Sequence, residues 1–239
     1  MDRSYPPHRL NKLLELLPES DAADVFPSLD LVDLPQHVIL SEAGKPIDHV
    51  YFLTEGIGSV FVTTPEGRHA EAGIFGYEGY IPTSAVADVA VSTFNVNMQI
   101  PGQAYRMPYS AFRKAMRENT NFEKIMIRAI EGFAVQLAYT AVSNAAHEVS
   151  ERLARWLLMC HDRVTGDDIY ITHDFIALML SVRRPSVTTS LHILEGNGFI
   201  RSERGVIRMR DRAGLEEFAH DAYGQPEREY KRLMSELAF

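Results

Sequence analysis

Hydrophobic residues between positions 171 and 209 change from helical to alternating spacing. Over residues 173–180 they recur every three or four positions, and Thr172 is placed to cap the first turn of a helix. A polar break at Ser181 follows. Pro185 then suits the first turn of another helix, because its missing amide proton would have no helical acceptor. We therefore predict two helices joined by a short turn.

The second predicted helix, residues 184–195, has one apolar and one polar face. Val187, Leu191 and Leu194 are four and three residues apart, so we expect them to face the core. The outward positions hold short polar or cationic residues, namely Arg184, Ser186, Thr188, Thr189 and His192. After this helix, residues 199–202 and 206–209 alternate as two strands around a turn at 203–205. The pattern predicts a helix-turn-helix followed by a β-hairpin wing.

Positive charge is concentrated around this predicted wing. The whole chain has a formal net charge of -8, which would argue against nucleic acid if the charge were evenly spread. Residues 181–212, however, contain seven arginines and three acidic residues, a local net charge of +4. Cations neutralise phosphates and position a protein on DNA, while helix residues read base edges in the major groove. The pattern favours a winged DNA reader over its alternative, a solvated basic hairpin on an ordinary helical domain.

We therefore expect double-stranded DNA as a partner. The predicted contacts come from the outward face of the second helix, from the residue before it and from the wing. They are Arg183, Arg184, Ser186, Thr188, Thr189, His192, Arg201, Arg204 and Arg208.

Residues 1–115 have a different pattern, with short β-rich runs separated by glycine and proline turns. Many short strands with such turns are typical of an antiparallel roll or barrel. The expected strands are residues 37–40, 49–53, 59–63, 69–75, 93–98 and 104–107.

Apolar residues at mixed spacings of three and four predict a long helix over residues 122–144. Such spacing is expected of a helix packed on a partner helix, so we interpret it as the dimerisation helix of a homodimer. Packing of the same residues against the roll within one chain is the alternative that the pattern leaves open. The predicted dimer contacts are Phe122, Ile125, Met126, Ala129, Ile130, Phe133 and Leu137.

Composition narrows the class of protein. With 239 residues and 46% hydrophobic content, the chain is long enough for two domains with cores of their own. Cys160 is the single cysteine, which excludes an internal disulfide and a cysteine-ligated iron–sulfur cluster within one chain. We find no continuous apolar run near the roughly 18 residues that span a bilayer, and no secretory signal at the start. A cytoplasmic protein without a membrane partner is expected.

Three phrases of the sequence resemble the CRP/FNR family of transcription regulators. They are residues 44–56 in the predicted roll, 151–158 before the reader, and 171–200 in the reader itself. The resemblance implies an α+β fold with an antiparallel β-roll (a double-stranded β-helix), a long dimerisation helix and a winged helix-turn-helix. It also implies a homodimer that reads a two-fold symmetric operator and is gated by an effector. RNA polymerase stays open as a further partner.

The resemblance also suggests how the chain is divided. We expect a cyclic-nucleotide-binding-like β-roll over residues 1–120 and a dimerisation helix over 121–145. The DNA-binding domain would then cover 146–212, and a C-terminal helical extension 213–239.

The roll departs from the members of the family that bind cyclic AMP. In those members a glutamate holds the ribose and an arginine pairs with the cyclic phosphate, where our alignment places Thr83 and Val91. Residues 70–105 contain no lysine or arginine, and an unpaired phosphate in a pocket would be costly. We therefore expect no tight binding of cyclic nucleotide unless Arg68 or Arg106 reaches into the pocket.

The effector itself is not identified by the sequence. Weak candidates for its contacts are Tyr77, Glu78, Tyr80 and Thr83, which lie where a ligand would sit if the pocket survives. A heme held by one or two histidines stays open, and no cofactor or metal is assigned.

The predicted reader departs from the family pattern as well. Ser181 occupies the turn position where glycine is usual, which predicts either a mildly strained backbone or a slightly altered turn. Where some members place a base-reading glutamate and arginine, this chain has Pro185 and Thr189. Arg184 is kept, and we expect it to read guanine. The operator should therefore differ from that of the cyclic-AMP branch.

A cupin-like metal enzyme built on the roll is the alternative from another class of function. Such enzymes place two histidines one residue apart on a strand, and no two histidines of this chain have that spacing. His37, His49 and His69 would have to converge by folding. We therefore expect no enzymatic activity, and a protein-interaction module built on the roll is the remaining alternative.

Overall fold

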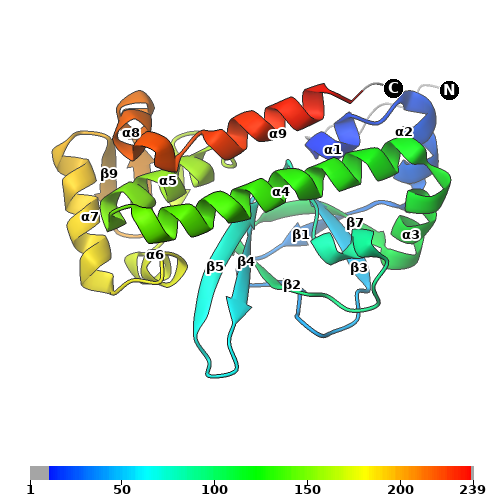
Figure 1. The fold of residues 1–239 in the computed structure, drawn as a ribbon, viewed down its shortest axis with the longest axis horizontal. Coiled ribbons are helices and arrows are strands. Elements are labelled where there is room, and N and C mark those ends of the chain that lie inside the picture. The colour runs from blue at the N-terminus through cyan, green and yellow to red at the C-terminus, as the bar shows by residue number, and fades with distance from the viewer. Residues whose placement is uncertain (1–10, 238–239) are drawn as a thin grey trace. The chain divides into compact units, whose positions relative to one another are not determined.

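The computed structural model describes residues 11–237 and shows strands, a long helix and a helix-turn-helix in the predicted order (Figure 1). Its residues group into two compact units. The first contains residues 11–58, 75–131 and 236–237, and the second contains 59–74 and 132–235. The first ten residues of the predicted domain 1–120, and the last two of the extension 213–239, lie outside the described residues.

The first unit is built from strands and short helices. β7 is central in one sheet and pairs antiparallel with β1 and with β3, for example Val32 with Ala104 and Phe52 with Tyr105. Its elements are α1 (Lys12–Glu15), α2 (Glu19–Val25), η1 (Phe26–Ser28), β1 (Asp30–Leu34), β2 (Ile39–Ser41), β3 (His49–Leu53), η2 (Thr83–Ala87), β6 (Asn95–Ile100), β7 (Gly102–Pro108) and α3 (Tyr109–Glu118).

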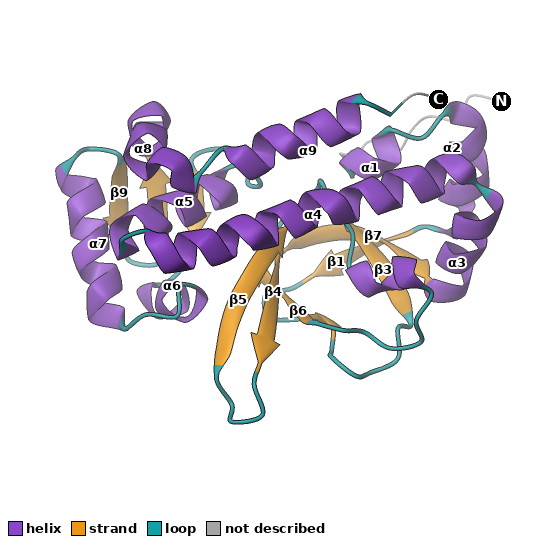
Figure 2. Ribbon diagram, in the orientation of Figure 1, coloured by secondary structure: helices purple, strands orange, loops and turns teal. Residues whose placement is uncertain are grey.

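The second unit contains a β-hairpin and the helix-turn-helix with its wing, as Figure 2 shows by secondary structure. Its elements after the hairpin follow one another without a long loop. They are β4 (Ile57–Thr63), β5 (His69–Phe75), α4 (Thr120–Ala146), α5 (Val149–His161), β8 (Asp168–Tyr170), α6 (His173–Met179), α7 (Arg184–Gly196), β9 (Ile200–Glu203), β10 (Val206–Met209), α8 (Arg212–Ala219), η3 (His220–Ala222) and α9 (Gln225–Ser235).

Three elements, β4, β5 and α4, contain residues of both units, and the boundary in β5 falls after Ile74. A four-stranded sheet has the order β2-β6-β4-β5, and the boundary falls within β4, after Gly58. The helix α4 is continuous over 27 residues, with the boundary after Glu131. The hairpin of residues 59–74 therefore groups with the C-terminal residues, whereas the sequence assigned it to the roll. The domain boundaries drawn from the sequence stay predictions.

The predicted α+β fold class is confirmed, with antiparallel sheets, a long helix and a C-terminal helix-turn-helix. β3 and β5 have the predicted bounds, and α5, the helix before the reader, spans residues 149–161. β1 and β8 were not predicted. β1 carries Asp30 and Asp33 and is mostly exposed, so it has little apolar pattern to recognise and depends on its pairing with β7.

Four aromatic side chains form the core of the first unit. Phe112 packs 5.7 Å from Tyr80 and 5.5 Å from Phe122, measured between ring centroids. Phe52 completes the cluster at 6.1 Å from Tyr80. None of these rings exposes more than 1% of its surface. A cluster of this kind adds directional ring contacts to the burial of large apolar surfaces.

The C-terminal extension packs back on its own unit. Phe218 on α8 lies 5.6 Å from Phe199, between ring centroids, and Leu215 is fully buried. On α9, Tyr230 approaches Gly132 of α4 so closely that a Cβ there would lie 3.0 Å from the ring. This favours the structural role for residues 213–237 over a free surface for the transcription machinery.

Candidate DNA-binding surface

The turn between α6 and α7 has the geometry that its sequence predicts. The Thr172 side chain accepts a hydrogen bond from the amide of Phe175 at 3.3 Å, which caps α6. Ser181 has φ of 52°, in the left-handed region that favours glycine. Arg152 of α5 donates a hydrogen bond to the carbonyl of Leu180 at 2.5 Å and so satisfies the end of α6. The predicted cap and the predicted strain at Ser181 are both confirmed.

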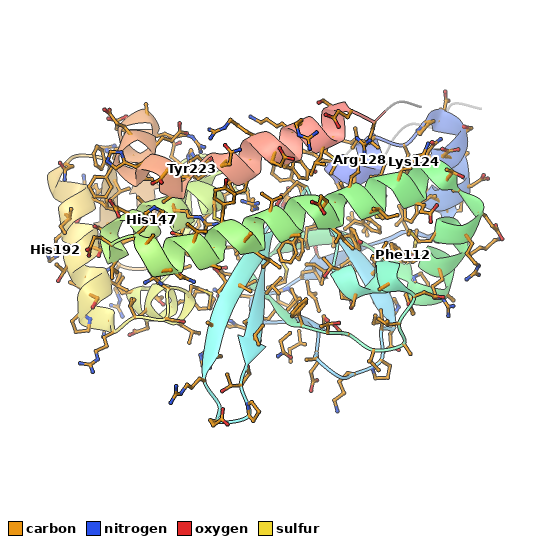
Figure 3. The ribbon with its side chains drawn as sticks, in the orientation of Figure 1. Phe112, Lys124, Arg128, His147, His192 and Tyr223 are labelled. Carbon is orange, nitrogen blue, oxygen red and sulfur yellow. The ribbon has the colours of Figure 1, made fainter. Side chains whose placement is uncertain are left out.

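The two faces of α7 differ as predicted. Val187, Leu191 and Leu194 are fully buried, which attaches the helix to the rest of its unit. On the opposite face, Thr189 and His192 are exposed, and Figure 3 labels His192 on this helix. Because the core side is closed by packing, the polar side is the only one that α7 can offer to another molecule.

The sequence analysis did not predict one exposed residue of this outer face. Ile193 leaves 41% of its surface exposed, one position after His192. An aliphatic side chain on a reading helix can contact the methyl group of thymine. The signal in the sequence was ambiguous, because an isoleucine beside Leu191 and Leu194 looks like part of the core stripe.

The wing is a three-stranded sheet rather than the predicted hairpin alone. β10 is central and pairs antiparallel with β9 and with β8, for example Arg208 with Arg201 and Ile207 with Ile169. Ile200, Ile207 and Met209 are buried, so the wing is anchored by its alternate side chains. Arg201, Arg204 and Arg208 lie on the exposed positions.

Several predicted DNA-contacting arginines have acidic partners within the chain. Arg184 Nε lies 3.1 Å from Asp174 Oδ1 on α6, and both side chains are mostly exposed. Arg201 pairs with Glu203 at 2.8 Å. Exposed pairs of this kind contribute little to stability and exchange readily with solvent, so a phosphate or a base edge can compete for these cations.

Arg208 has the firmest partner. Its Nε and Nη2 donate to the two carboxylate oxygens of Asp168 at 2.6 and 2.8 Å, and these hydrogen bonds lower the pKa of that carboxyl. Such two-point pairs fix the geometry of the guanidinium. By contrast, no carboxylate lies within 4.0 Å of Arg183 or Arg204 in the described part of the chain. Arg183 and Arg204 are therefore the cations most available for phosphates.

The shorter polar residues of α7 are placed less uniformly. Ser186 and Thr188 are half-buried, and the Thr188 hydroxyl donates to the carbonyl of Arg184 at 3.3 Å. Thr188 therefore uses its hydrogen bond within the helix. Thr189 and His192 are the polar side chains that face outward most fully.

The predicted dimer contacts of α4 lie largely inside the chain. Phe122, Ile125 and Met126 are fully buried, and Ala129 and Phe133 are each 6% exposed. Ile130 and Leu137 are half-buried. Phe122 packs on Phe52 and Phe112, whose places in the first unit are described above. This burial corrects the choice of residues, because it favours the alternative that the stripe packs within one chain.

The exposed face of α4 is a different stripe. It is formed by Ile127, Ala134, Ala138, Ala141, Val142 and Ala145. These positions recur every three or four residues, and Glu131 is the one charged residue among them. By length and composition α4 also resembles a membrane-crossing helix, although only 33% of its most apolar window is buried in this chain. Arg128 and Glu131 interrupt this helix, so it contains no continuous apolar run of that length, in agreement with the sequence analysis.

The four weak effector candidates differ in their surroundings. Tyr80 belongs to the aromatic core, and its hydroxyl donates to the carbonyl of Met126 at 3.4 Å. The ring of Tyr77 lies 4.6 Å from the ammonium group of Lys12, and Glu78 accepts a hydrogen bond from the amide of Gly76. Thr83 begins the short helix η2. Tyr77, Glu78 and Tyr80 therefore have contacts within the chain, and an effector role for the four residues stays a prediction.

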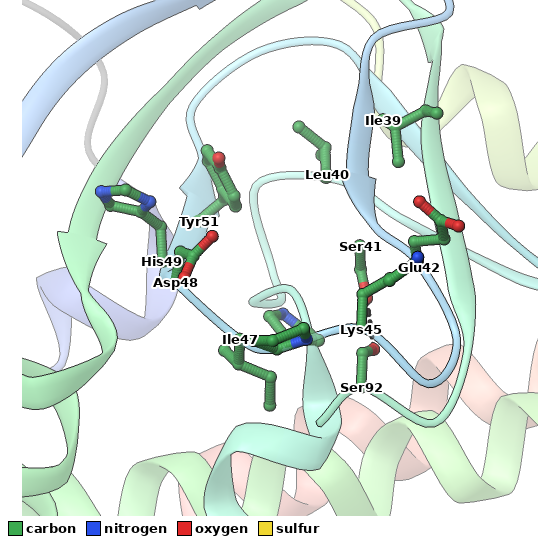
Figure 4. Close-up of a pocket in the computed structure, with 12 residues that line it drawn as sticks. Ile39, Leu40, Ser41, Glu42, Lys45, Ile47, Asp48, His49, Tyr51 and Ser92 are labelled. Carbon is green, nitrogen blue, oxygen red and sulfur yellow. Dashed lines mark hydrogen bonds between the residues drawn. The ribbon is translucent and has the colours of Figure 1, made fainter. Parts of the chain in front are cut away.

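A recess of about 200 Å³ lies elsewhere in the first unit (Figure 4). Its wall includes Lys45, His49 and Tyr51, but also the carboxylates of Glu42 and Asp48, which offset the charge of Lys45. Arg68 is exposed in the turn after β4, and Arg106 pairs with Asp30 at 3.8 Å. Neither arginine lines this recess.

The histidines of the cupin alternative do not form a metal site. Among residues 11–237, no three histidine, cysteine, aspartate or glutamate side chains gather as metal ligands. His37 lies before β2, whereas His49 and His69 begin β3 and β5. Cys160 is fully buried, and burial raises the pKa of its thiol well above its usual range.

Comparison with known proteins identifies both halves of the chain. Residues 31–119 match the cyclic nucleotide-binding domain, and residues 151–218 match the Crp-like helix-turn-helix domain. No curated protein matches this sequence.

Solved structures share this fold at low sequence identity. FixK2 from Bradyrhizobium japonicum superposes with a TM-score of 0.69 at 14% identity, over 80% of this chain and 98% of that one. A transcriptional regulator of the CRP/FNR family from Thermus thermophilus has a TM-score of 0.64 at 18% identity, over 80% and 98%. The c-di-GMP-responsive global regulator CLP of Xanthomonas campestris has a TM-score of 0.63 at 12% identity, over 81% and 99%.

With a cyclic-nucleotide-binding-like domain followed by a Crp-like helix-turn-helix, the chain belongs to the CRP/FNR family of transcription regulators.

Proposed function

We propose that this protein acts as a homodimer that reads a two-fold symmetric DNA operator with α7, while the wing arginines contact phosphates. The observation that carries the proposal is the outer face of α7, where Thr189 and His192 are exposed beside an arginine-bearing wing. One α-helix fits the major groove of B-form DNA, and its exposed side chains reach base edges there. Phosphate contacts from the wing would hold the helix in register.

Within this interface we assign different tasks to different residues. Arg184 reads guanine after exchanging Asp174 for the base, because both partners of that pair are exposed. Thr189 and His192 are further readers, and Ile193 contacts a thymine methyl group. Ser186 and Thr188 contact the phosphate backbone of the DNA. Arg183 and Arg204 neutralise phosphates, joined by Arg201 and Arg208 when DNA displaces their carboxylate partners.

The dimer is proposed to form through the exposed stripe of α4. Ile127 and Val142 leave 51% and 54% of their surfaces exposed in a single chain. Contact between so much apolar surface and water is unfavourable, and burial in an interface would remove it. The alanines between them allow the backbones of two helices to approach closely. A second copy of the same helix is the partner that such a self-complementary face fits, because a two-fold axis pairs identical stripes.

The proposed function also suggests where in the cell the protein works. The family's regulators act on DNA, and a chain of this fold that reads an operator would work in the cytoplasm. We therefore propose a cytoplasmic location.

The main experiment is selection of random duplexes by the purified, ligand-free protein, followed by sequencing of the bound pool. We expect two inverted half-sites whose centres are about 10 to 10.5 bp apart, or a multiple of this spacing. A single half-site without symmetry would contradict the dimeric reader. If no motif is enriched with ligand-free protein or in cell extract, the assignment of α7 as a reader is wrong.

Sedimentation of the protein in the micromolar range tests the dimer separately. A mass of twice 27.0 kDa is expected. A monomer at every concentration would contradict the proposed stripe even if DNA binding is found.

We also propose that cyclic AMP is not the gating ligand. The interior of the first unit is filled by Phe52, Tyr80, Phe112 and Phe122, and residues 70–105 contain no cation. A buried cyclic phosphate would therefore lack a charged partner. In a calorimetric titration with cyclic AMP we expect a Kd no lower than about 0.1 mM. This Kd corresponds to a binding free energy of about -5.5 kcal/mol. Saturable binding at micromolar concentrations would overturn this part of the proposal.

A further inference from the structure

The β4–β5 hairpin contacts the helix before the DNA reader through one carboxyl group. Glu71 of β5 accepts a hydrogen bond at Oε1 from Trp156 Nε1 of α5 at 2.9 Å. At Oε2 it accepts a hydrogen bond from Ser59 Oγ of β4 at 2.7 Å. Ser59 Oγ also lies 3.5 Å from Met179 Sδ of α6. All four residues belong to the second unit.

The charged groups around Glu71 come from α5 and the segment after it. Arg155 and Arg163 place positive charge near the carboxylate, and Cys160 adds a buried thiol. Arg155 Nη2 donates to Thr140 Oγ1 at 3.1 Å, and Arg163 Nη1 donates to the carbonyl of Met159 at 2.7 Å. Both guanidinium groups are therefore bonded elsewhere while they act on Glu71 through their charge.

The remaining surroundings of the hairpin are neutral or exposed. Gln136 of α4 and Met179 of α6 contribute neutral contacts. His69 lies two residues away on β5 and is exposed.

Removal from water decides the protonation of Glu71. Burial raises the pKa of Glu71 to about 7, against the hydrogen bonds from Ser59 and Trp156 and the charges of Arg155 and Arg163, which lower it. A carboxyl with this pKa is protonated in about half of the molecules at neutral pH. The pKa of the Cys160 thiol is raised as well, so that thiol stays neutral in the same range.

Another connection holds the hairpin without any ionisable group. The Gln136 side chain of α4 accepts from the amide of Ile74 at 2.8 Å and donates to its carbonyl at 3.2 Å. Gly73 makes room for it, because a Cβ there would lie 2.6 Å from Gln136 Oε1. The hairpin is thus fixed on α4 by an amide and on α5 by a carboxyl, and only the carboxyl can ionise.

We propose that Glu71, Ser59 and Trp156 form a proton-sensitive latch, which holds the β4–β5 hairpin on α5 when Glu71 is protonated and loosens when Glu71 is ionised. Protonation adds a donor to Glu71 and removes a charge from poorly hydrated surroundings. Ionisation restores the charge, and the carboxylate then gains by moving into water. The latch itself follows from these contacts, whereas its effect on DNA rests on the function proposed above.

The direction of the pH effect follows from the two pKa values. The latched state binds the proton with a pKa of about 7, and the released glutamate has its ordinary value of about 4.3. Closure is therefore favoured at low pH, and the stability of the latched state falls as pH rises between these values. From pH 6 to pH 8 the closure constant should fall roughly tenfold.

Trp156 provides the readout because it is the single tryptophan of the chain. We expect the emission of the full-length protein to titrate with a midpoint near pH 7. Glu71→Gln keeps an acceptor for Trp156 but cannot ionise, so its emission should be constant over pH 6–8. Glu66→Gln makes the same change at an exposed position in the turn between the strands, and should titrate like the wild type.

Ser59→Ala keeps the test decisive if Glu71→Gln does not fold. The hydrogen bond from Ser59 favours the ionised carboxylate, so its removal should move the midpoint to higher pH. A wild-type titration that persists unchanged in Glu71→Gln would overturn the latch. So would the absence of any emission change from pH 5.5 to 8.5, or a downward shift of the midpoint in Ser59→Ala.

A separate experiment measures the Kd of the wild type and of the variants for the selected operator. If the latch acts on the reader, the wild-type Kd should change between pH 6 and pH 8 by up to about tenfold more than that of Glu71→Gln. Loss of operator binding by every variant at every pH would count against the proposed function. The emission titration would still decide the latch.

Discussion

α4 and α7 both bury one stripe of side chains and expose another, but the exposed stripes have opposite chemistry. The outer face of α7 carries Thr189 and His192 with arginines beside it, whereas that of α4 carries alanines, Ile127 and Val142. Hydrated polar side chains are ready to meet phosphates and base edges. An apolar face gains most when another apolar face removes it from water. The difference indicates DNA for one helix and a second copy of the chain for the other.

The largest effect should come from a charge on the α4 stripe. Ala138→Glu would place two carboxylates, one from each copy, into the proposed dimer contact. An uncompensated charge in such a place costs about 3 to 5 kcal/mol, so we expect a monomer by sedimentation and loss of operator binding. Ala213→Glu, on an exposed position of α8, is the matched control and should remain dimeric. If Ala138→Glu stays a dimer, α4 pairs through another face or not at all.

A pair of neighbouring residues separates the two faces of α7. Leu191 is fully buried, so Leu191→Ala should lower the free energy of unfolding by about 2 to 5 kcal/mol in a denaturant titration. His192 is exposed, and His192→Ala should change the same quantity by less than about 0.5 kcal/mol while weakening operator binding. Equal losses of stability in the two variants would show that the outer face is not free.

Arg184 and Arg204 separate base reading from phosphate contact. Arg184→Ala should cost about 1 to 3 kcal/mol on the selected operator and relax the preference at one base pair. Arg204→Ala should weaken binding to all sequences alike and reduce the salt dependence by about one unit of slope. Fluorescence anisotropy with the operator and a scrambled duplex, at several salt concentrations, distinguishes them. An unchanged base preference in Arg184→Ala would contradict its assignment.

The smallest effect is expected in the turn before α7. Ser181 has φ of 52°, so Ser181→Gly removes strain and should raise stability by about 0.5 kcal/mol, or the melting temperature by about 1 to 2 °C. Ser110 lies in the helix α3, where the same substitution should destabilise by about 0.5 to 1 kcal/mol. A lower melting temperature for Ser181→Gly would mean that its hydroxyl contributes more than the strain costs.

The reader was predictable from the sequence because its signals are local. A capping threonine, a proline in the first turn and two alternating runs each act within a few residues of themselves. The helices α6 and α7 and the strands β9 and β10 therefore lie close to their predicted bounds. The acidic partners of Arg184 and Arg208 were not predicted, since Asp174 and Asp168 come from other elements.

The roll was predictable in outline, but its interior was not. Short alternating runs predicted most of its strands, and the lack of cations in residues 70–105 argued against a cyclic phosphate. That Tyr80 packs with Phe52 and Phe112, rather than facing a ligand, depends on side chains far apart in the sequence. Periodicity reports which side of an element is apolar, and does not report what that side meets.

The sequence alone determined the order of strands, long helix and winged helix-turn-helix, because hydrophobic period and turn residues specify local structure. Only the tertiary structure decided which stripe of α4 is buried. Both stripes of that helix are apolar with the same spacing. In the folded chain one stripe is buried in the core, and the other, with Ile127 and the alanines, is exposed. The contact of Glu71 with Trp156, 85 positions apart, was likewise decided by folding, since nothing near either residue in the sequence marks the other as its partner.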